Sequence, residues 1–334
     1  MLRMTSLAFA LVLSCAPGRA EVRLASAHAI VVDEATGEVL LSKDVLTAAP
    51  IASLTKLITA MVVLDARQDA NERLRIEAAD LDHLKHSRGG VPVGAVVSRG
   101  ALLELALIAS DNRAASALAR HYPGGIEAFH LGVVRKIRNL ALESTLIADP
   151  TGLSPHNMSN AEDMVKVLRA AASYPEIAQI TSKRNHEVLV NGRSRTVRNT
   201  NRLVGAPGWD ISLSKTGYTN EAGRCLSMRV QAAGRTVIVV LMGAVKPSAR
   251  KVDATNILRW LSHEAPVQTV AAHRVQRRFA AHIGGDGALE PRRTRVTASP
   301  LESRVATVEP VDASAQPRDE PTESPAPAPA LAGE

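Results

Sequence analysis

A serine and a lysine stand three residues apart in the apolar run "PIASLTKLITA", residues 50–60. Positions i and i+3 share one face of a helix, so the amine of Lys56 can reach the hydroxyl of Ser53. A serine becomes a strong nucleophile only when a base removes its proton. Lysine can be that base only when burial or a second cation lowers its pKa. The pair therefore predicts acyl transfer, provided that both side chains face a pocket.

The Ser-x-x-Lys spacing alone is a weak signal, because it occurs at 53–56, 212–215 and 248–251. Each occurrence taken alone is more simply a surface serine near a lysine. Pro50 precedes the pair at 53–56 and favours a helix that begins near Ser53. The N-terminus of such a helix offers free N–H groups where an oxyanion would develop.

A second motif, "SDN" at 110–112, lies between two expected helices. Ser110 could handle a proton, and the amide of Asn112 could bind a substrate peptide. Ser, Asp and Asn are also the residues favoured in turns and at helix N-caps. Ordinary turn chemistry therefore explains this motif when it is considered alone.

The third motif is "SKTGYTNEAGRCLSM", residues 214–228. Lys215 and the hydroxyl of Thr216 could bind a carboxylate, and Gly217 would let a substrate lie against the backbone as an added strand. An edge strand whose lysine prevents aggregation is the simpler alternative. The order of the three motifs, 57 and then 105 residues apart, makes a chance arrangement hard to accept.

Helices and strands that could position these motifs follow from the hydrophobic pattern. A β-hairpin is expected over 27–43, and a loop at 88–94. Helices are expected over 101–109, 113–122, 126–142 and 247–264, and from the capping-box spacing of "SNAE" (159–162) to about 172. Strand pairs are expected at 186–191 with 194–198, and at 225–231 with 235–243.

The two ends of the chain differ from its middle. Arg3, "SLAFALVL" and "GRA" predict a signal peptide over residues 1–20 that is cleaved after Ala20, with lipid attachment at Cys15 as an alternative. Cleavage would leave Cys225 alone, as a small core residue with no disulfide partner. Residues 265–334 hold nine of the eighteen prolines and predict a disordered tail. We expect a periplasmic protein, because export without a membrane span leads there.

Net charge is +7, which suits solubility or attraction to an anionic surface. The tail could support peripheral association with the membrane or the cell wall. Nucleic acid is not an expected partner.

The three motifs, together with "IASDNRAASALARHYPGG", "DPTGLSPHNMS" and "RNTNRLV", resemble the low-molecular-weight penicillin-binding proteins, which are serine D,D-peptidases of the bacterial cell wall. The likeness is greatest to their D-alanyl-D-alanine endopeptidase branch. It implies an α+β fold of the β-lactamase and transpeptidase type, in which an antiparallel sheet is flanked by helices and joined to an all-α subdomain. The peptidase domain would span 21–264.

The resemblance also implies roles for the motif residues. Ser53 would be the nucleophile, Lys56 its general base, and Ser110 the group that passes a proton to the leaving amine. The remaining matched residues would hold the substrate: Asn112 at the donor peptide, Lys215 and Thr216 at the carboxylate, Gly217 along the strand, and the N–H groups of Ser53 and Thr219 in an oxyanion hole. Lys215 would also help keep Lys56 neutral, and Asp111 would orient the loop. No metal or cofactor is implied.

The implied reaction is hydrolysis of D-Ala–diaminopimelate crosslinks in peptidoglycan through an acyl-enzyme, with β-lactams as inhibitors. Three alternatives remain at this point. A D-alanyl-D-alanine carboxypeptidase would share the reacting residues. A class A β-lactamase would need a glutamate in an "ExxxLN" context, which Glu127, Glu143, Glu162 and Glu176 all lack. A non-catalytic wall-binding scaffold would use the tail to recruit partners.

Overall fold

The computed structural model describes residues 22–87 and 89–263. The expected signal peptide at 1–20 and the expected tail at 265–334 lie outside the described residues. No helix in the described part of the chain combines the length and the apolar character needed to cross a membrane.

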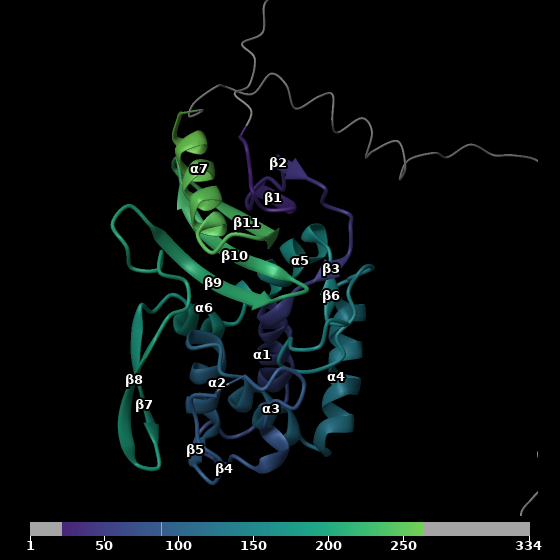
Figure 1. Ribbon diagram of the computed structural model, residues 1–334, viewed down its shortest axis with the longest axis vertical. Coiled ribbons are helices and arrows are strands. Elements are labelled where there is room, and N and C mark those ends of the chain that lie inside the picture. The colour runs from purple at the N-terminus through teal and green to yellow at the C-terminus, as the bar shows by residue number, and fades with distance from the viewer. Residues whose placement is uncertain (1–21, 88, 264–334) are drawn as a thin grey trace, which may run out of the picture. The chain divides into compact units, whose positions relative to one another are not determined.

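Five antiparallel strands form the main sheet, in the order β2-β1-β11-β10-β9 (Figure 1). Their bounds are β1 His28–Asp33, β2 Val39–Lys43, β9 Asp210–Thr219, β10 Gly223–Ala232 and β11 Arg235–Ala244. The hairpins expected around 27–43 and 225–243 are therefore present. Strand β9, which carries the third motif, lies at an edge of the sheet and leaves one side of its backbone free.

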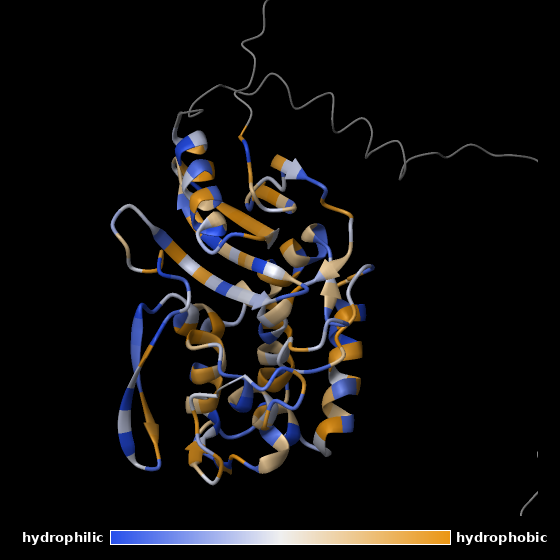
Figure 2. Cartoon of the chain, in the orientation of Figure 1, coloured by the Kyte–Doolittle hydropathy of each residue, from blue (hydrophilic) through white to orange (hydrophobic). Residues whose placement is uncertain are grey.

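Both faces of this sheet are buried, because side chains alternate along the strands. On β1, Ile30 and Val32 join one apolar cluster, whereas Ala29 and Val31 join another. The second cluster is completed by helix α7 (Ala249–His263), along which hydrophobic and hydrophilic residues alternate in bands (Figure 2). The first cluster faces the helical part of the protein. The result is a sheet packed between α7 and the other helices.

Helix α1 (Thr55–Asp65) lies at the centre of the helical part (Figure 1). All nine residues from Thr55 to Val63 are buried, so this part of the helix has no solvent-facing side. The helices around it are α2 Arg99–Ile108, α3 Asn112–Arg120, α4 Gly125–Asn139, α5 Ala161–Ala172 and α6 Pro175–Thr181. Three two-stranded pairs complete the structure: β3 Ala49–Pro50 with β6 Met158–Ser159, β4 Arg73–Arg75 with β5 Val96–Ser98, and β7 Asn185–Val190 with β8 Arg193–Arg198.

This architecture confirms the α+β class, with an antiparallel sheet flanked by helices. One expected detail is wrong by a residue. Helix α5 is capped by Asn160, whose side chain accepts the N–H of Asp163 at 2.8 Å. Ser159, the expected cap, instead shares a hydrogen bond with Thr145. The capping-box spacing therefore located the helix but not its first residue.

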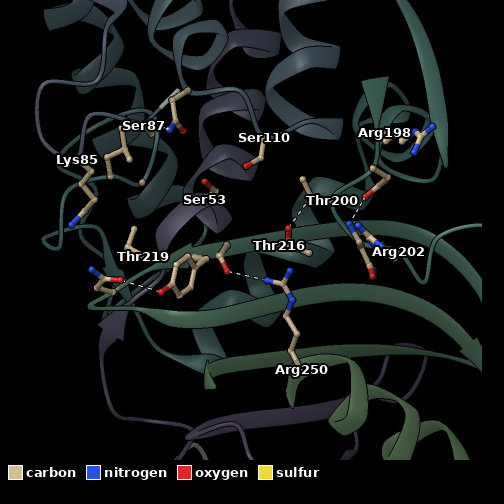
Figure 3. Close-up of a pocket in the computed structure, with 18 of the residues that line it drawn as sticks. Ser53, Lys85, Ser87, Ser110, Arg198, Thr200, Arg202, Thr216, Thr219 and Arg250 are labelled. Carbon is tan, nitrogen blue, oxygen red and sulfur yellow. Dashed lines mark hydrogen bonds between the residues drawn. The ribbon is translucent and has the colours of Figure 1, made fainter. Parts of the chain in front are cut away.

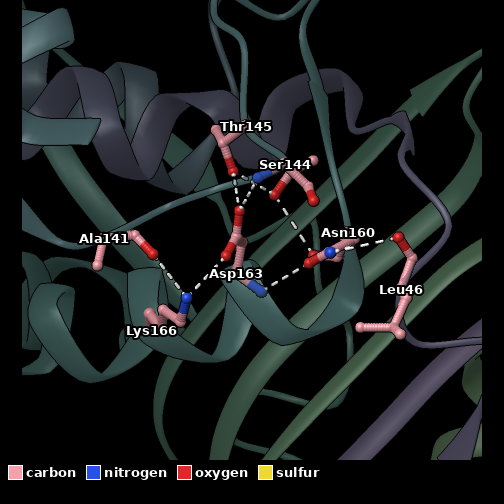
Figure 4. A network of polar contacts seen from close by, with 8 residues as sticks. Leu46, Ala141, Ser144, Thr145, Asn160, Asp163 and Lys166 are labelled. Atoms are coloured by element: carbon pink, nitrogen blue, oxygen red, sulfur yellow. Dashed lines mark hydrogen bonds and ion pairs between the residues drawn. The ribbon is translucent and has the colours of Figure 1, made fainter. Parts of the chain in front are cut away.

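The carboxylate of Asp163 ties the start of α5 to the preceding loop (Figure 4). It accepts hydrogen bonds from Ser144 N at 2.8 Å, Thr145 Oγ1 at 2.9 Å and Lys166 Nζ at 3.0 Å, and only 2% of the residue is exposed. Asp163→Ala removes the buried acceptor that these partly buried donors share, so we expect a loss of about 3 kcal/mol of unfolding free energy and a fall in Tm of about 6–12 °C. Thermal unfolding of the variant and of the wild type measures this fall in Tm.

Glu162→Ala is the matched control, since Glu162 is an acidic residue of the same helical turn without these bonds. Its loss should stay within about 1 kcal/mol. Equal destabilisation by the two variants would show that the carboxylate acts only through the helix dipole.

Candidate active site

Ser53 and Lys56 are in contact at the N-terminal end of α1. Ser53 lies in the short 3-10 turn Ala52–Leu54, and Lys56 lies in the first turn of α1. Lys56 is 1% exposed, and its Nζ lies 3.0 Å from Ser53 Oγ, 2.7 Å from Asn112 Oδ1 and 2.7 Å from the Thr151 carbonyl. A neutral amine can donate to the last two oxygens and keep its lone pair for the proton of Ser53.

Burial is the main influence on the charge of Lys56. It lowers the pKa of the amine to about 7, against the attraction of Asp149, Asp111 and Asp82, which raises it. A substantial fraction of the amine is therefore unprotonated at neutral pH. A lowered pKa is the condition under which Lys56 can act as the base for Ser53.

Ser110 and Lys215 form a second contact, between the α2–α3 connection and β9. Lys215 Nζ donates to Ser110 Oγ at 2.8 Å and is also 1% exposed. Burial, followed by the positive charges of Lys56 and Arg250, holds the pKa of Lys215 well below its usual value. Repulsion between the two lysines thus adds to burial at Lys215, whereas burial alone dominates at Lys56.

Asn112 and Asp111 of the "SDN" motif make different contacts. The Asn112 side chain joins two elements, because its Oδ1 faces Lys56 and its Nδ2 donates to Ser87 Oγ at 2.9 Å. Asp111 is the N-cap of α3 and accepts the N–H groups of Ala114 and Gly90. The turn chemistry and the site are therefore parts of one arrangement.

Gly217 allows β9 to lie directly against the nucleophile's turn. A Cβ at this position would lie 2.9 Å from the carbonyl oxygen of Ile51 and 3.0 Å from the backbone nitrogen of Ser53. Thr216 and Thr219 flank this approach on the same strand, and Thr216 Oγ1 donates to Thr200 Oγ1 at 2.7 Å. The free edge of β9 thus passes beside the Ser53 N–H.

The loop "DPTGL" fixes the carbonyl that receives Lys56. Asp149 accepts the N–H groups of Thr151, Gly152 and Ser154 at 2.7–2.9 Å. Gly152 has φ +85°, and a Cβ there would lie 2.0 Å from the carbonyl oxygen of Ala52. No other residue could hold this loop against the turn of Ser53.

Two residues of the site have a left-handed backbone conformation. Ala52, next to the nucleophile, has φ 46°, and Ser110 has φ 59°. Left-handed conformations of this kind cost about 1–3 kcal/mol each and persist where the surrounding structure imposes them.

All these segments meet in one cleft of about 860 Å³ (Figure 3). Ser53, Ser110, Asn112, Thr216, Gly217 and Thr219 line it, while Lys56 and Lys215 reach their serines from below the surface. Among the described residues that line the cleft, none is an aspartate or a glutamate. The three distant sequence motifs therefore build one site.

Residues 16–246 match the sequence profile of the D-alanyl-D-alanine carboxypeptidase family. The chain belongs to this family.

Relatives of this D-alanyl-D-alanine carboxypeptidase family member include proteins named D-alanyl-D-alanine endopeptidase. The Escherichia coli protein is 40% identical over 71% of this chain and 77% of its own. The Pseudomonas aeruginosa protein is 40% identical over 76% of this chain and 84% of its own. Among solved structures, the D-alanyl-D-alanine carboxypeptidase of Mycobacterium tuberculosis is 27% identical and matches with a TM-score of 0.66, covering 76% of this chain and 97% of that one. The resemblance to serine D,D-peptidases and the fold that it implied are thereby confirmed.

The other two Ser-x-x-Lys occurrences in this family member do not form such a pair. Ser212 and Lys215 lie on β9, where residues three apart point to opposite faces, and Ser212 accepts a hydrogen bond from Arg229. Ser248 and Lys251 are both exposed at the start of α7. Cys225 is fully buried, and burial raises the pKa of its thiol to about 11. It is a core residue, as the sequence indicated.

Several side chains of the site were not found from the sequence. Thr200 contacts Thr216, and Arg250 donates to the carbonyl oxygens of Gly217 and Cys225, both at 3.1 Å. Burial lowers the pKa of Arg250, with repulsion from Arg224 as a further cause. Thr200 lies in "NTN" (199–201), within a segment that carries the family resemblance, but no role for Thr200 followed from the sequence, and the arginine of α7 carried no local signal.

Proposed function

We propose that this chain is a D-alanyl-D-alanine endopeptidase, a periplasmic serine D,D-peptidase that hydrolyses D-Ala–diaminopimelate crosslinks in peptidoglycan. The observation that carries the proposal is the buried Lys56 amine, with a pKa of about 7, placed 3.0 Å from Ser53 Oγ. The two relatives that share 40% identity and bear the endopeptidase name support the choice of substrate.

Acylation follows from the contacts of the site. Neutral Lys56 takes the proton of Ser53, and Oγ attacks the D-Ala carbonyl carbon. The N–H groups of Ser53 and Thr219 would stabilise the oxyanion, and Asn112 would hold the donor peptide. The proton that Lys56 has taken would pass through the hydroxyl of Ser110 to the departing amine, so that Lys56 and Ser110 return to their starting protonation states. Water then hydrolyses the acyl-enzyme and restores Ser53.

The leaving group keeps one carboxylate beside the scissile bond. Thr216 and Lys215 would bind it at the edge of β9, where the hydroxyl can donate a hydrogen bond and the charge of the bound anion favours the protonated form of the lysine. Penicillin carries a carboxylate in a comparable position, so it would acylate Ser53 as a slowly released mimic.

The absence of acidic side chains among the described lining residues argues against a class A β-lactamase, which needs a glutamate to activate the deacylating water. A wall-binding scaffold without activity would have no use for two buried lysines, because each is costly to desolvate. Endopeptidase and carboxypeptidase share the reacting groups, so the substrate decides between them.

The deciding experiment incubates the purified protein with crosslinked muropeptide dimers and, separately, with pentapeptide monomers. We expect monomers to be released from the dimers. Loss of terminal D-Ala alone would identify a carboxypeptidase, rapid turnover of β-lactams a β-lactamase, and failure to label with fluorescent penicillin a scaffold.

The pH dependence of acylation tests the role of Lys56. Because the reactive form is the neutral amine and its pKa is about 7, the second-order rate of penicillin acylation should rise about tenfold per pH unit from pH 5 to 6 and level off above 7. Stopped-flow or time-resolved labelling across this range measures it. A rate independent of pH from 5 to 8 would contradict the assignment.

Export is part of the same proposal. We infer that residues 1–20 are removed after Ala20, that 21–264 form the peptidase domain, and that 265–334 are available for peripheral association with the wall or the membrane. Intact-mass analysis of the periplasmic protein would give a mature N-terminus at Glu21.

A further inference from the structure

One end of the cleft is strongly basic. The lining of the whole cleft includes five cationic residues, Lys85, Arg184, Arg198, Arg202 and Arg250. The reaction proposed above needs cations only at the carboxylate next to the scissile bond, where Lys215 and Thr216 already stand. Three of the five cationic residues, Arg184, Arg198 and Arg202, are exposed and have no task in that chemistry.

These three arginines lie on the Thr200 and Thr216 side of the nucleophile, where the proposed function would place the leaving group. In Figure 3, Arg198 and Arg202 lie beyond Thr200 and Thr216, on the side opposite to Lys85 and Thr219. Arg184 belongs to the same side, because the neighbouring Asn185 pairs with Arg198 in the β7–β8 hairpin. Strand β8, which Arg198 ends, is largely hydrophilic (Figure 2).

The backbone that carries them is held in place. The Asn199 side chain donates to the carbonyls of Thr181 and Lys183 at 2.9 and 3.0 Å. The backbone N–H of Asn199 donates to the carbonyl of Arg184. Asn201 Nδ2 donates to Ser214 Oγ of β9 at 2.8 Å. The three arginines therefore project from a segment fixed between α6 and β9.

Their charges are not neutralised by the described part of the chain. Within residues 22–87 and 89–263 no ion pair involves Arg184, Arg198 or Arg202, whereas Lys85, at the opposite end of the cleft, pairs with Glu221 at 2.6 Å. The cationic excess is thus confined to one end of the cleft.

We propose that Arg184, Arg198 and Arg202 form a subsite that binds the carboxylates of the acceptor stem peptide in crosslinked peptidoglycan. This inference rests on the proposed function. A D-Ala leaving group has a single carboxylate, which Thr216 and Lys215 would bind. An acceptor stem carries more, at its D-glutamate α-carboxyl and at its C-terminus, and these would extend past Thr200 toward the arginines. The subsite therefore selects crosslinked substrates over pentapeptide monomers.

The test compares Arg198→Gln/Arg202→Gln with the wild type on muropeptide dimers. Removing two exposed ion pairs should lower kcat/KM about five- to thirtyfold, mainly through KM. Removal of D-Ala from pentapeptide monomers and acylation by penicillin should stay within about twofold. The matched control is Arg73→Gln/Arg193→Gln, which loses the same charge at exposed positions outside the cleft and should behave as the wild type.

A second arm changes the substrate. Dimers amidated only at the D-glutamate α-carboxyl and the C-terminus of the acceptor stem should be cleaved by the wild type as slowly as the double variant cleaves ordinary dimers, and the double variant should not distinguish the two. If the wild type cleaves dimers and the double variant matches it, the subsite is wrong and the proposed function stands. If the wild type leaves dimers intact, the proposed function itself is wrong and the subsite with it.

Discussion

Ser53→Ala is expected to abolish the covalent penicillin adduct and the hydrolysis of crosslinked muropeptides. Alanine has no group that could form the acyl-enzyme, and the remaining hydroxyl in the cleft that contacts a lysine, Ser110, is paired with Lys215 rather than with Lys56. Intact-mass spectrometry after incubation with penicillin should show the wild type with an added mass and the variant without one.

The structure should survive this substitution. Ser53 is only half-buried, and alanine fits the short turn before α1, so Tm should change by no more than a few degrees. Ser248→Ala is the matched control: it removes a serine from the same Ser-x-x-Lys spacing at an exposed site, and labelling should remain at the wild-type level. An adduct retained by Ser53→Ala would place the nucleophile elsewhere and overturn the assignment.

The local sequence was sufficient for the elements that carry the site. The apolar run after Pro50 predicted α1, the hairpin signals located β1–β2 and β10–β11, and turn-forming residues placed "SDN" between two helices. These features depend on side chains within a few residues of one another. The same is true of Asp111, whose role as an N-cap is set by the N–H groups that follow it.

What the sequence could not give depends on packing between distant segments. The same Ser-x-x-Lys spacing produces a contact at 53–56, opposite faces of a strand at 212–215 and exposed side chains at 248–251. Nothing local distinguishes them, because the pKa of Lys56 depends on burial beneath the loop of Asp149. Arg250 reaches the cleft only because α7 packs on the sheet that contains β9.

Resemblance to a known family supplied what local rules could not. It joined the three motifs into one site before any contact was visible, and the contacts Lys56–Ser53, Lys56–Asn112 and Lys215–Ser110 agree with that grouping. It assigned no role to the basic end of the cleft: Arg198 and Arg202 belong to "RNTNRLV", one of the segments that carry the resemblance, but none of the implied roles falls on them.

Lys56→Met is expected to slow acylation by penicillin about a thousandfold or more, because the variant has no group that can accept the proton of Ser53. Methionine matches the length of lysine and suits a site that is 1% exposed. The substitution leaves Asn112 Oδ1 and the Thr151 carbonyl without their donor, but it also removes the desolvation cost of a buried amine. The free energy of unfolding should therefore change by no more than about 2 kcal/mol. The residual rate should no longer vary between pH 5 and 7.

Lys56→Arg distinguishes two roles of Lys56, that of a proton acceptor and that of a positively charged hydrogen-bond donor. Arginine keeps a positive donor near Ser53, Asn112 and Thr151 but stays protonated throughout the accessible pH range, so it cannot act as a base. We expect it to be as slow as the methionine variant, with the same flat pH profile, while Lys251→Met at the exposed Ser-x-x-Lys occurrence keeps the wild-type rate. Acylation by Lys56→Arg within tenfold of the wild type would mean that the side chain contributes its charge and its hydrogen bonds, and that another group removes the proton from Ser53.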